Sequence, residues 1–163
     1  VYASSNSEMN RNFALWHSLL KEGDVSPTSF SLSVHNALIG QWSELRQVKS
    51  ETTSIMARVD NLETALLEAT LLLNEGHAKV LVVIAESQLE AKYNAQPGIR
   101  TPLGYALALV VTKGEQYQLT LTGSPFNNDV TDNALTWVSH QYLESRTWHT
   151  PSSSNGTWLW LKN

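Results

Sequence analysis

The chain has 163 residues, of which 42% are hydrophobic and 16% are charged, so it fits one globular domain with a hydrophobic core and is not a disordered tail. Its formal net charge is −4 and its Lys and Arg residues are scattered, which argues against a nucleic-acid-binding or polybasic membrane-binding protein. Because the chain contains no cysteine, disulfides, cysteine-ligated zinc and cysteine nucleophiles are excluded.

The apolar runs at residues 71–73 and 80–85 are far shorter than the roughly 20 residues needed to cross a bilayer, and no signal peptide opens the sequence. We therefore expect a cytoplasmic protein without a membrane span. The opening segment VYASS is typical of a core strand, and we expect a further segment upstream of it.

The first helix is predicted from Glu8, where apolar side chains recur every three to four residues until Gly23. A loop is predicted at residues 26–28, and helical spacing resumes over residues 34–45. Residues 52–56 form a short β-branched run between polar residues, which favours a strand.

A second clearly delimited helix follows, because Asp60 and Glu63 have the spacing of a capping box and Gly76 ends the apolar periodicity. The continuous apolar run of residues 80–85 is typical of a strand that is buried on both faces. A strand, a helix and a strand of these lengths predict two parallel strands joined by a right-handed crossover.

The second half of the chain begins with a polar loop over residues 87–102. Residues 103–112 and 116–122 are predicted to form two antiparallel strands joined by a tight turn. Asp132 is expected to cap a last helix that extends to residue 142. A Ser-rich linker at residues 151–156 precedes a terminal strand in WLWLK.

The sequence contains no glycine-rich phosphate loop, no GxSxG turn and no HExxH motif. Its five histidines are dispersed, and no two have the i, i+4 spacing of a helical metal site. We therefore predict no metal site and no cofactor. His35 and Asn36 form a prominent polar pair at a predicted helix start, and we interpret the pair as structural rather than catalytic.

The six tryptophans fall into two groups of three. The first group lies on predicted apolar helix faces, where packing in the core is expected: Trp16, Trp42 and Trp137. The second group lies near the end of the chain, where a partner interface and packing on the parent sheet are equal alternatives: Trp148, Trp158 and Trp160.

The ordered set of these features resembles the N-terminal half of the β-ketoacyl synthases, the condensing enzymes of the thiolase fold. SVHNALIG resembles the family's helix with Asn-x-x-x-Gly, TTSIMA resembles the strand before the nucleophile, and LLLNEGHAKVLVVIA resembles the helix end, the glycine and the buried strand. Counting forward from Asn36 and back from Gly76 by the family's spacing reaches Val59 as the position of the nucleophile.

The resemblance implies an α/β fold that is half of a thiolase-like αβαβα fold. Its expected sheet is mixed, mostly parallel and five-stranded, with helices on its faces. We expect one ketosynthase-like domain over residues 1–163, truncated relative to full ketosynthases.

The chain is especially similar to shortened proteins described as chain-length-factor-like, which occur beside full ketosynthases in bacterial aryl polyene clusters. It shares with them SPTxFSxSVHNAxxG from Ser26, EGHxKVL and a Trp-rich ending, although the likeness is loose after about Gly123. Val59 stands where a condensing enzyme has its cysteine, and the resemblance does not extend to the family's second half, which supplies two catalytic histidines. The glutamine that polyketide chain-length factors carry at this position is absent too. The resemblance therefore implies a protein without enzyme activity.

Ketosynthases pair through the strand before the nucleophile, and each subunit contributes to its partner's acyl pocket. By this resemblance the partner interface consists of Thr52, Thr53, Ser54, Ile55, Met56 and Ala57. Ser33 and Val34 would line the partner's pocket. The strand has no charge or proline, so its exposed edge is expected to be paired.

The leading hypothesis is a non-catalytic subunit that forms a heterodimer, or a heterotetramer, with a full-length β-ketoacyl synthase, stabilises it and shapes its acyl pocket. The acyl carrier protein would then contact this subunit only indirectly, through the synthase. One alternative is a small acyl-transferase or thioester hydrolase that uses His35 with Ser33, Ser43 or Ser54, although no nucleophile motif supports it. Another is a homodimeric scaffold for acyl carrier protein, which the acidic net charge disfavours because carrier proteins are acidic themselves.

Overall fold

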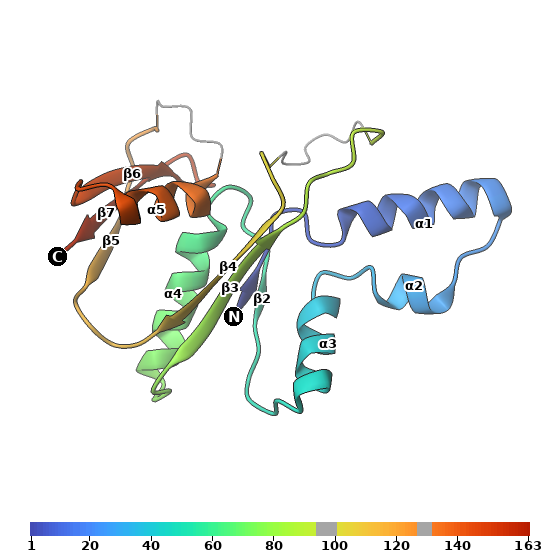
Figure 1. The fold of residues 1–163 in the computed structure, drawn as a ribbon, viewed down its shortest axis with the longest axis horizontal. Coiled ribbons are helices and arrows are strands. Elements are labelled where there is room, and N and C mark those ends of the chain that lie inside the picture. The colour runs from blue at the N-terminus through green and yellow to red at the C-terminus, as the bar shows by residue number, and fades with distance from the viewer. Residues whose placement is uncertain (94–100, 127–131) are drawn as a thin grey trace.

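Two β-sheets and five helices form the computed structural model, which describes residues 1–93, 101–126 and 132–163 (Figure 1). The first sheet has the strand order β2-β1-β3-β4, with bounds β1 Tyr2–Ala3, β2 Ser54–Ile55, β3 Val80–Glu86 and β4 Tyr105–Val111. The second sheet has the order β5-β7-β6, with bounds β5 Tyr117–Thr122, β6 Thr147–Pro151 and β7 Thr157–Lys162. The helices are α1 Met9–Glu22, α2 Pro27–Ser31, α3 Ala37–Arg46, α4 Asn61–Asn74 and α5 Asn133–Tyr142.

The first sheet is mixed and mostly parallel, as predicted. β1 pairs in parallel with both β2 and β3, whereas β4 pairs with β3 in the antiparallel direction. The predicted parallel strands before and after α4 are therefore confirmed, but they are not neighbours, because β1 lies between them. Within the described residues the sheet has four strands and not the expected five.

The predicted hairpin between residues 103–112 and 116–122 is wrong. β4 pairs with β3 along its whole length, and β5 pairs with β7 of the other sheet. The turn signal at residues 113–115 is local, whereas the choice of neighbouring strand depends on pairing with distant segments. The chain crosses from one sheet to the other at this point.

Strand β6 was not predicted from the sequence, and the predicted linker at residues 151–156 is mainly the tight turn between β6 and β7. Ser152 donates its backbone N–H to the carbonyl of Gly156 at 3.0 Å, which closes this turn. A Cβ atom on Gly156 would lie 2.5 Å from the carbonyl oxygen of Thr122, so the close approach of β5 requires a glycine. Part of the predicted loop at 87–102, residues 94–100, lies outside the described residues.

Helix α4 contacts both sheets, and the hydrophobic core lies around it. Its buried face includes Leu62, Ala65 and Ala69, which join Val82 and Ile84 of β3 in one cluster. Trp148 and Trp160 of the second sheet belong to the same cluster and stack with ring centroids 5.5 Å apart. Burial of a side chain such as Leu62, Val82 or Ile84 stabilises the fold by about 1.5–3 kcal/mol.

The tryptophan predictions have mixed outcomes. All three tryptophans near the end of the chain are buried, which decides in favour of packing within the protein: Trp148, Trp158 and Trp160. Trp137 is half-buried and packs against the core, as expected. Trp16 and Trp42 are not core residues, because they are 62% and 40% exposed.

Helices α1, α2 and α3 form an arm that projects beyond the β2 edge of the first sheet (Figure 1). None of the three helices has a buried residue. The predicted end of α1 is confirmed, since Gly23 has φ 72° and donates its N–H to the Leu19 carbonyl. The predicted loop at residues 26–28 is instead the start of α2, where Ser26 Oγ accepts from the Ser29 N–H and Pro27 occupies the first turn.

Candidate functional site

Val59, which we predict to stand at the family's nucleophile position, is a half-buried residue in the turn between β2 and α4. The cavity that it lines has a volume of only about 10 Å³. Arg58, Asn61, Glu86 and Tyr105 also line this cavity. A space of this size has room for about one water molecule and cannot hold an acyl group.

A polar network centred on Glu86 fixes this turn. The Glu86 carboxylate accepts from the Ser5 N–H at 2.5 Å, from Asn61 Nδ2 at 3.0 Å and from Ser4 Oγ at 3.2 Å. Asn61 also accepts from the Ala57 N–H through Oδ1 at 2.7 Å. The network joins the ends of β1, β2 and β3 to the start of α4, and desolvation raises the pKa of Glu86 above its ordinary value.

Asp60 does not cap α4 with its side chain, contrary to the capping-box prediction. Its Oδ2 atom accepts from Trp158 Nε1 at 2.9 Å, from Ser152 Oγ at 3.1 Å and from the Ser153 N–H at 3.1 Å. The carboxylate thus binds the β6–β7 turn to the first turn of α4, and this long-range set of donors outcompetes the local cap.

Glu63 makes a similar connection one helical turn later and is completely buried. It accepts from Thr150 Oγ1 at 2.6 Å, from Trp160 Nε1 at 3.1 Å and from Asn133 Nδ2 at 3.1 Å. Desolvation raises the pKa of Glu63, and the three donors only partly oppose that effect. Two spacings in the sequence could have indicated that these acidic residues pair with the tryptophans. Asp60 and Glu63 lie three residues apart on one face of a helix, and Trp158 and Trp160 lie two residues apart on one face of a strand.

Strand β2 is an edge strand in the described structure, with β1 as its neighbour. The carbonyls of Thr53 and Ile55 accept from the N–H groups of Tyr2 and Ser4, at 2.8 and 3.2 Å. Because backbone groups alternate in direction along a strand, the N–H groups of Ser54 and Met56 face the open edge. This edge therefore offers hydrogen-bond donors to a further strand.

The side chains of the predicted interface differ in exposure. Ile55 is half-buried and packs against the core, whereas Met56 is 64% exposed. Thr52 is exposed, and Thr53, Ser54 and Ala57 are half-buried. The two predicted pocket-lining residues also differ, because Ser33 is buried and Val34 is 47% exposed.

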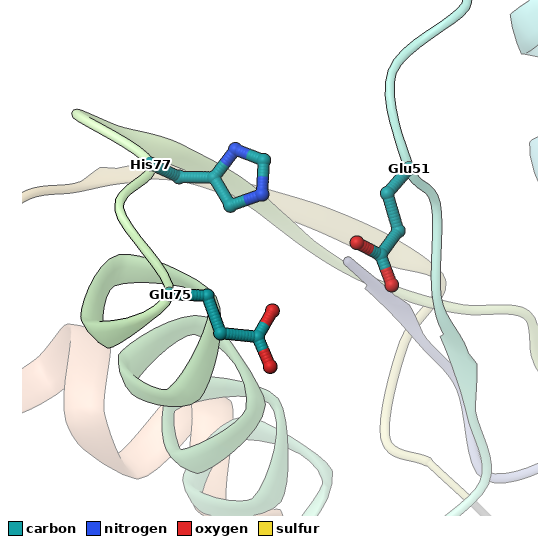
Figure 2. A group of neighbouring side chains, drawn as sticks. All are labelled: Glu51, Glu75 and His77. Atoms are coloured by element: carbon teal, nitrogen blue, oxygen red, sulfur yellow. The ribbon is translucent and has the colours of Figure 1, made fainter.

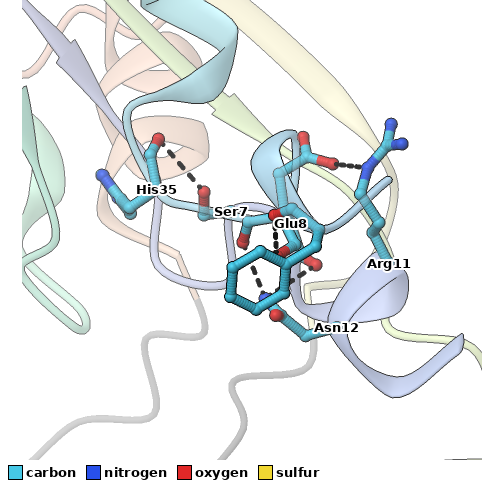
Figure 3. Close-up of polar contacts among 7 residues, drawn as sticks. Ser7, Glu8, Arg11, Asn12 and His35 are labelled. Atoms are coloured by element: carbon cyan, nitrogen blue, oxygen red, sulfur yellow. Dashed lines mark hydrogen bonds and ion pairs between the residues drawn. The ribbon is translucent and has the colours of Figure 1, made fainter. Parts of the chain in front are cut away.

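His35 joins the turn before α3 to both β1 and β2. Its Nδ1 atom lies 2.7 Å from Ser54 Oγ, and its Nε2 atom lies 3.2 Å from the carbonyl oxygen of Ser4. Ser7 Oγ donates to the His35 carbonyl, as Figure 3 shows. These contacts agree with the structural interpretation of His35, although the approach of a serine hydroxyl to an oriented imidazole is also the geometry of a nucleophile and its base.

The same turn is held to α1 by Asn12, which donates to the Ser33 carbonyl at 2.9 Å (Figure 3). Ser33 Oγ donates to the Phe30 carbonyl at 2.7 Å, so this hydroxyl serves the local turn. Ser43 Oγ is buried and has no hydrogen-bond partner within the described residues. Among the contacts of the described residues, Ser54 is the one serine of the three proposed nucleophiles that approaches an imidazole.

Apolar side chains on the arm are exposed in unusual number for helices. These side chains include Trp16 (62% exposed), Leu20 (82%), Phe30 (62%) and Leu45 (82%). Exposed apolar groups gathered on one unit mark an interaction surface. In the described parts of the chain, none of the helices has the length and apolar character needed to cross a membrane.

Comparison with known proteins places these features in a family. The family model described as "Beta-ketoacyl synthase, N-terminal domain" matches residues 1–161. The solved complex of a ketosynthase (ApeO) with its chain length factor (ApeC) from Xenorhabdus doucetiae contains a similar chain, with a TM-score of 0.85 and 24% sequence identity. The match covers 99% of this chain and 68% of that chain, and it confirms the expected ketosynthase-like fold. No curated protein matches the sequence.

Proposed function

Because this chain belongs to the family of β-ketoacyl synthase N-terminal domains, we propose that it is a non-catalytic, chain-length-factor-like subunit of an active β-ketoacyl synthase. It forms a heterodimer with the synthase, stabilises it and helps to shape the acyl pocket. The setting we propose is aryl polyene biosynthesis, and the similar chain in a solved complex of a ketosynthase with its chain length factor supports a subunit of this kind.

The observation that carries the proposal is an open strand edge directly before a small cavity at Val59, the predicted nucleophile position. β2 lies at the edge of its sheet, while the cavity at Val59 has a volume of about 10 Å³. A condensing enzyme needs a nucleophile and a space for its acyl group at this point, whereas a pairing subunit needs only the strand.

Two further observations support a large interface around β2. The arm of α1, α2 and α3 lies beyond this edge and exposes apolar side chains such as Phe30 and Val34. His35 connects the arm to Ser54 of β2, so the strand and the arm are in direct contact. Val34 is therefore the residue of the predicted pair that reaches the partner's pocket, and Ser33 supports it from within the turn.

Co-expression with a ketosynthase encoded beside this protein tests the proposal. The two proteins should co-purify, and the synthase should be more soluble and release products of different length than the synthase alone. Met56→Asp should abolish co-purification, because it places a charge in the proposed strand pairing without touching the core.

Tyr142→Asp is the matched control, since Tyr142 is 86% exposed and lies on α5, on the other sheet's side of the molecule. We choose Met56 over Ile55 because Ile55→Asp would also damage the core. Two proteins that purify separately, with synthase solubility and product length unchanged, would refute the proposal.

The contact between His35 and Ser54 at 2.7 Å favours one second candidate, a Ser/His thioester hydrolase or acyl-transferase. The Nε2 atom of His35 faces the Ser4 carbonyl, so Nδ1 can accept the hydroxyl proton of Ser54. Ser54 lines neither the cavity at Val59 nor the groove that Trp42 and Leu81 line, which argues for a structural contact between Ser54 and His35. Thioesterase activity of the purified protein that is lost in both His35→Ala and Ser54→Ala would establish this second candidate.

A further inference from the structure

Three potential metal ligands from two separate segments converge on the surface of the protein. Glu51 precedes β2, while Glu75 and His77 flank Gly76 in the turn between α4 and β3 (Figure 2). One ligand atom from each residue lies within 4.8 Å of the corresponding atoms of the other two. Histidine spacing on one helix could not predict this group, because its members come from different elements.

No described residue forms an ion pair with this group. The ion pairs within the described residues are Arg11 with Glu8 and Lys92 with Glu90, and neither involves this group. The three side chains also make no hydrogen bond with any other described residue. Two carboxylates that approach one another repel unless a cation lies between them, and the neighbouring imidazole offers a further lone pair to such a cation.

The donor set selects the class of cation. An imidazole nitrogen with two carboxylate oxygens suits Zn²⁺ and its spectroscopic substitute Co²⁺, whereas Mg²⁺ and Ca²⁺ prefer oxygen ligands alone. Bonds to zinc of about 2.0–2.2 Å place neighbouring ligand atoms closer together than 4.8 Å, so the exposed side chains would approach by small rotations. Three protein ligands leave a fourth position for water.

We infer that Glu51, Glu75 and His77 form a surface Zn²⁺ site. The ion joins the segment that leads into β2 to the turn between α4 and β3. Glu51 is adjacent to Thr52, the first residue of the proposed partner interface, so the ion fixes the entry to the pairing strand. The inference does not depend on the proposed function, because it rests on the ligand geometry alone.

The site also adjoins a groove with a volume of about 460 Å³. Glu51, His77 and Lys79 line one part of this groove, and apolar residues of α3 and the sheet, among them Trp42 and Leu81, line another. A bound ion would therefore hold the wall of the groove that the segment before β2 and the α4–β3 turn share.

Titration calorimetry of the full chain with ZnCl₂ tests the inference. We expect one ion per chain, no heat with MgCl₂, and a loss of affinity of at least about tenfold in both His77→Ala and Glu75→Gln. His17→Ala is the matched control, because His17 is an exposed histidine on α1 outside the group, and it should bind zinc like the unchanged protein.

All three ligand residues are exposed, so these variants should fold normally, which circular dichroism checks. Co²⁺ should give the visible spectrum of a four-coordinate site, and that spectrum should disappear in His77→Ala. The inference is overturned if the unchanged protein binds no zinc, if His77→Ala binds it equally well, or if sedimentation shows that binding requires two copies of the chain.

Discussion

Glu63 illustrates how a single side chain can tie two sheets together. Its carboxylate accepts hydrogen bonds from Thr150, Trp160 and Asn133 in a fully buried setting. Glu63→Ala would remove the acceptor that these donors share, which should lower the free energy of unfolding by about 3 kcal/mol. Urea denaturation measures this loss, and Glu115→Ala, at an exposed position, should change the value by no more than about 0.5 kcal/mol.

The pH dependence of stability follows from the same residue. Desolvation raises the pKa of Glu63 in the folded protein, so the folded state holds this proton more tightly than the unfolded state does. Its contribution to stability is therefore fully present below the ordinary glutamate pKa and is lost as the pH rises through the raised one. We expect the free energy of unfolding of the unchanged protein, relative to that of Glu63→Gln, to decrease from acidic to neutral pH. If the difference between the two proteins does not vary with pH, the raised pKa of Glu63 is contradicted.

Val59 gives a prediction about chemistry. Val59→Cys should not produce condensing activity, because the cavity at this residue has a volume of about 10 Å³ and cannot accommodate an acyl group. The assay uses acyl-loaded and malonyl-loaded carrier protein, with a full ketosynthase as the positive control. Turnover by the variant alone would show that this turn can still support catalysis.

At the residue scale, the sequence indicated positions better than partners. Counting predicts Val59 at the nucleophile position, which stays a prediction, and the structural interpretation of His35 agrees with its contacts to Ser54 and Ser4. The partners of Asp60 and Glu63 could not be predicted, because they lie about 70–98 residues away in β6, β7 and α5. A local capping pattern cannot reveal that distant donors will compete for the same carboxylate.

Helix α4 is the element on which the core depends, and its small residues set its distance from the sheets. Ala65 and Ala69 are completely buried between α4 and its neighbours. Ala69→Leu should therefore cost about 1–3 kcal/mol of stability through overpacking. Leu71→Ala on the exposed side of the helix, where Leu71 is 59% exposed, should cost much less, and similar losses in the two variants would contradict the packing described here.

Elements with strong periodicity were predicted well, and elements defined by their neighbours were not. The 3.6-residue period located α1 and α4, and the apolar run located β3, because these signals are contained in the segment itself. The apolar run also predicted that β3 is buried on both faces, but Leu81 on its outer face is 41% exposed. The hairpin prediction failed because β4 and β5 each find a partner elsewhere in the chain.

At the scale of the whole molecule, the structure combines a well-packed body with an arm whose helices lie outside the hydrophobic core. The body contains both sheets, α4 and α5, whereas α1, α2 and α3 have no buried residue. Helices stabilised by one apolar face need a surface to cover it. In our account the synthase partner covers that face and extends the sheet at β2.

Hydrogen exchange of the peptide that covers residues 52–57, measured with and without the ketosynthase, tests this account most directly. If a strand of the partner pairs with β2, the amide protons of Ser54 and Met56 should exchange much more slowly in the complex, and Met56→Asp should remove this protection. Protection at α5, with residues 52–57 exchanging at the same rate in the free and mixed samples, would contradict the claim that β2 is the pairing strand.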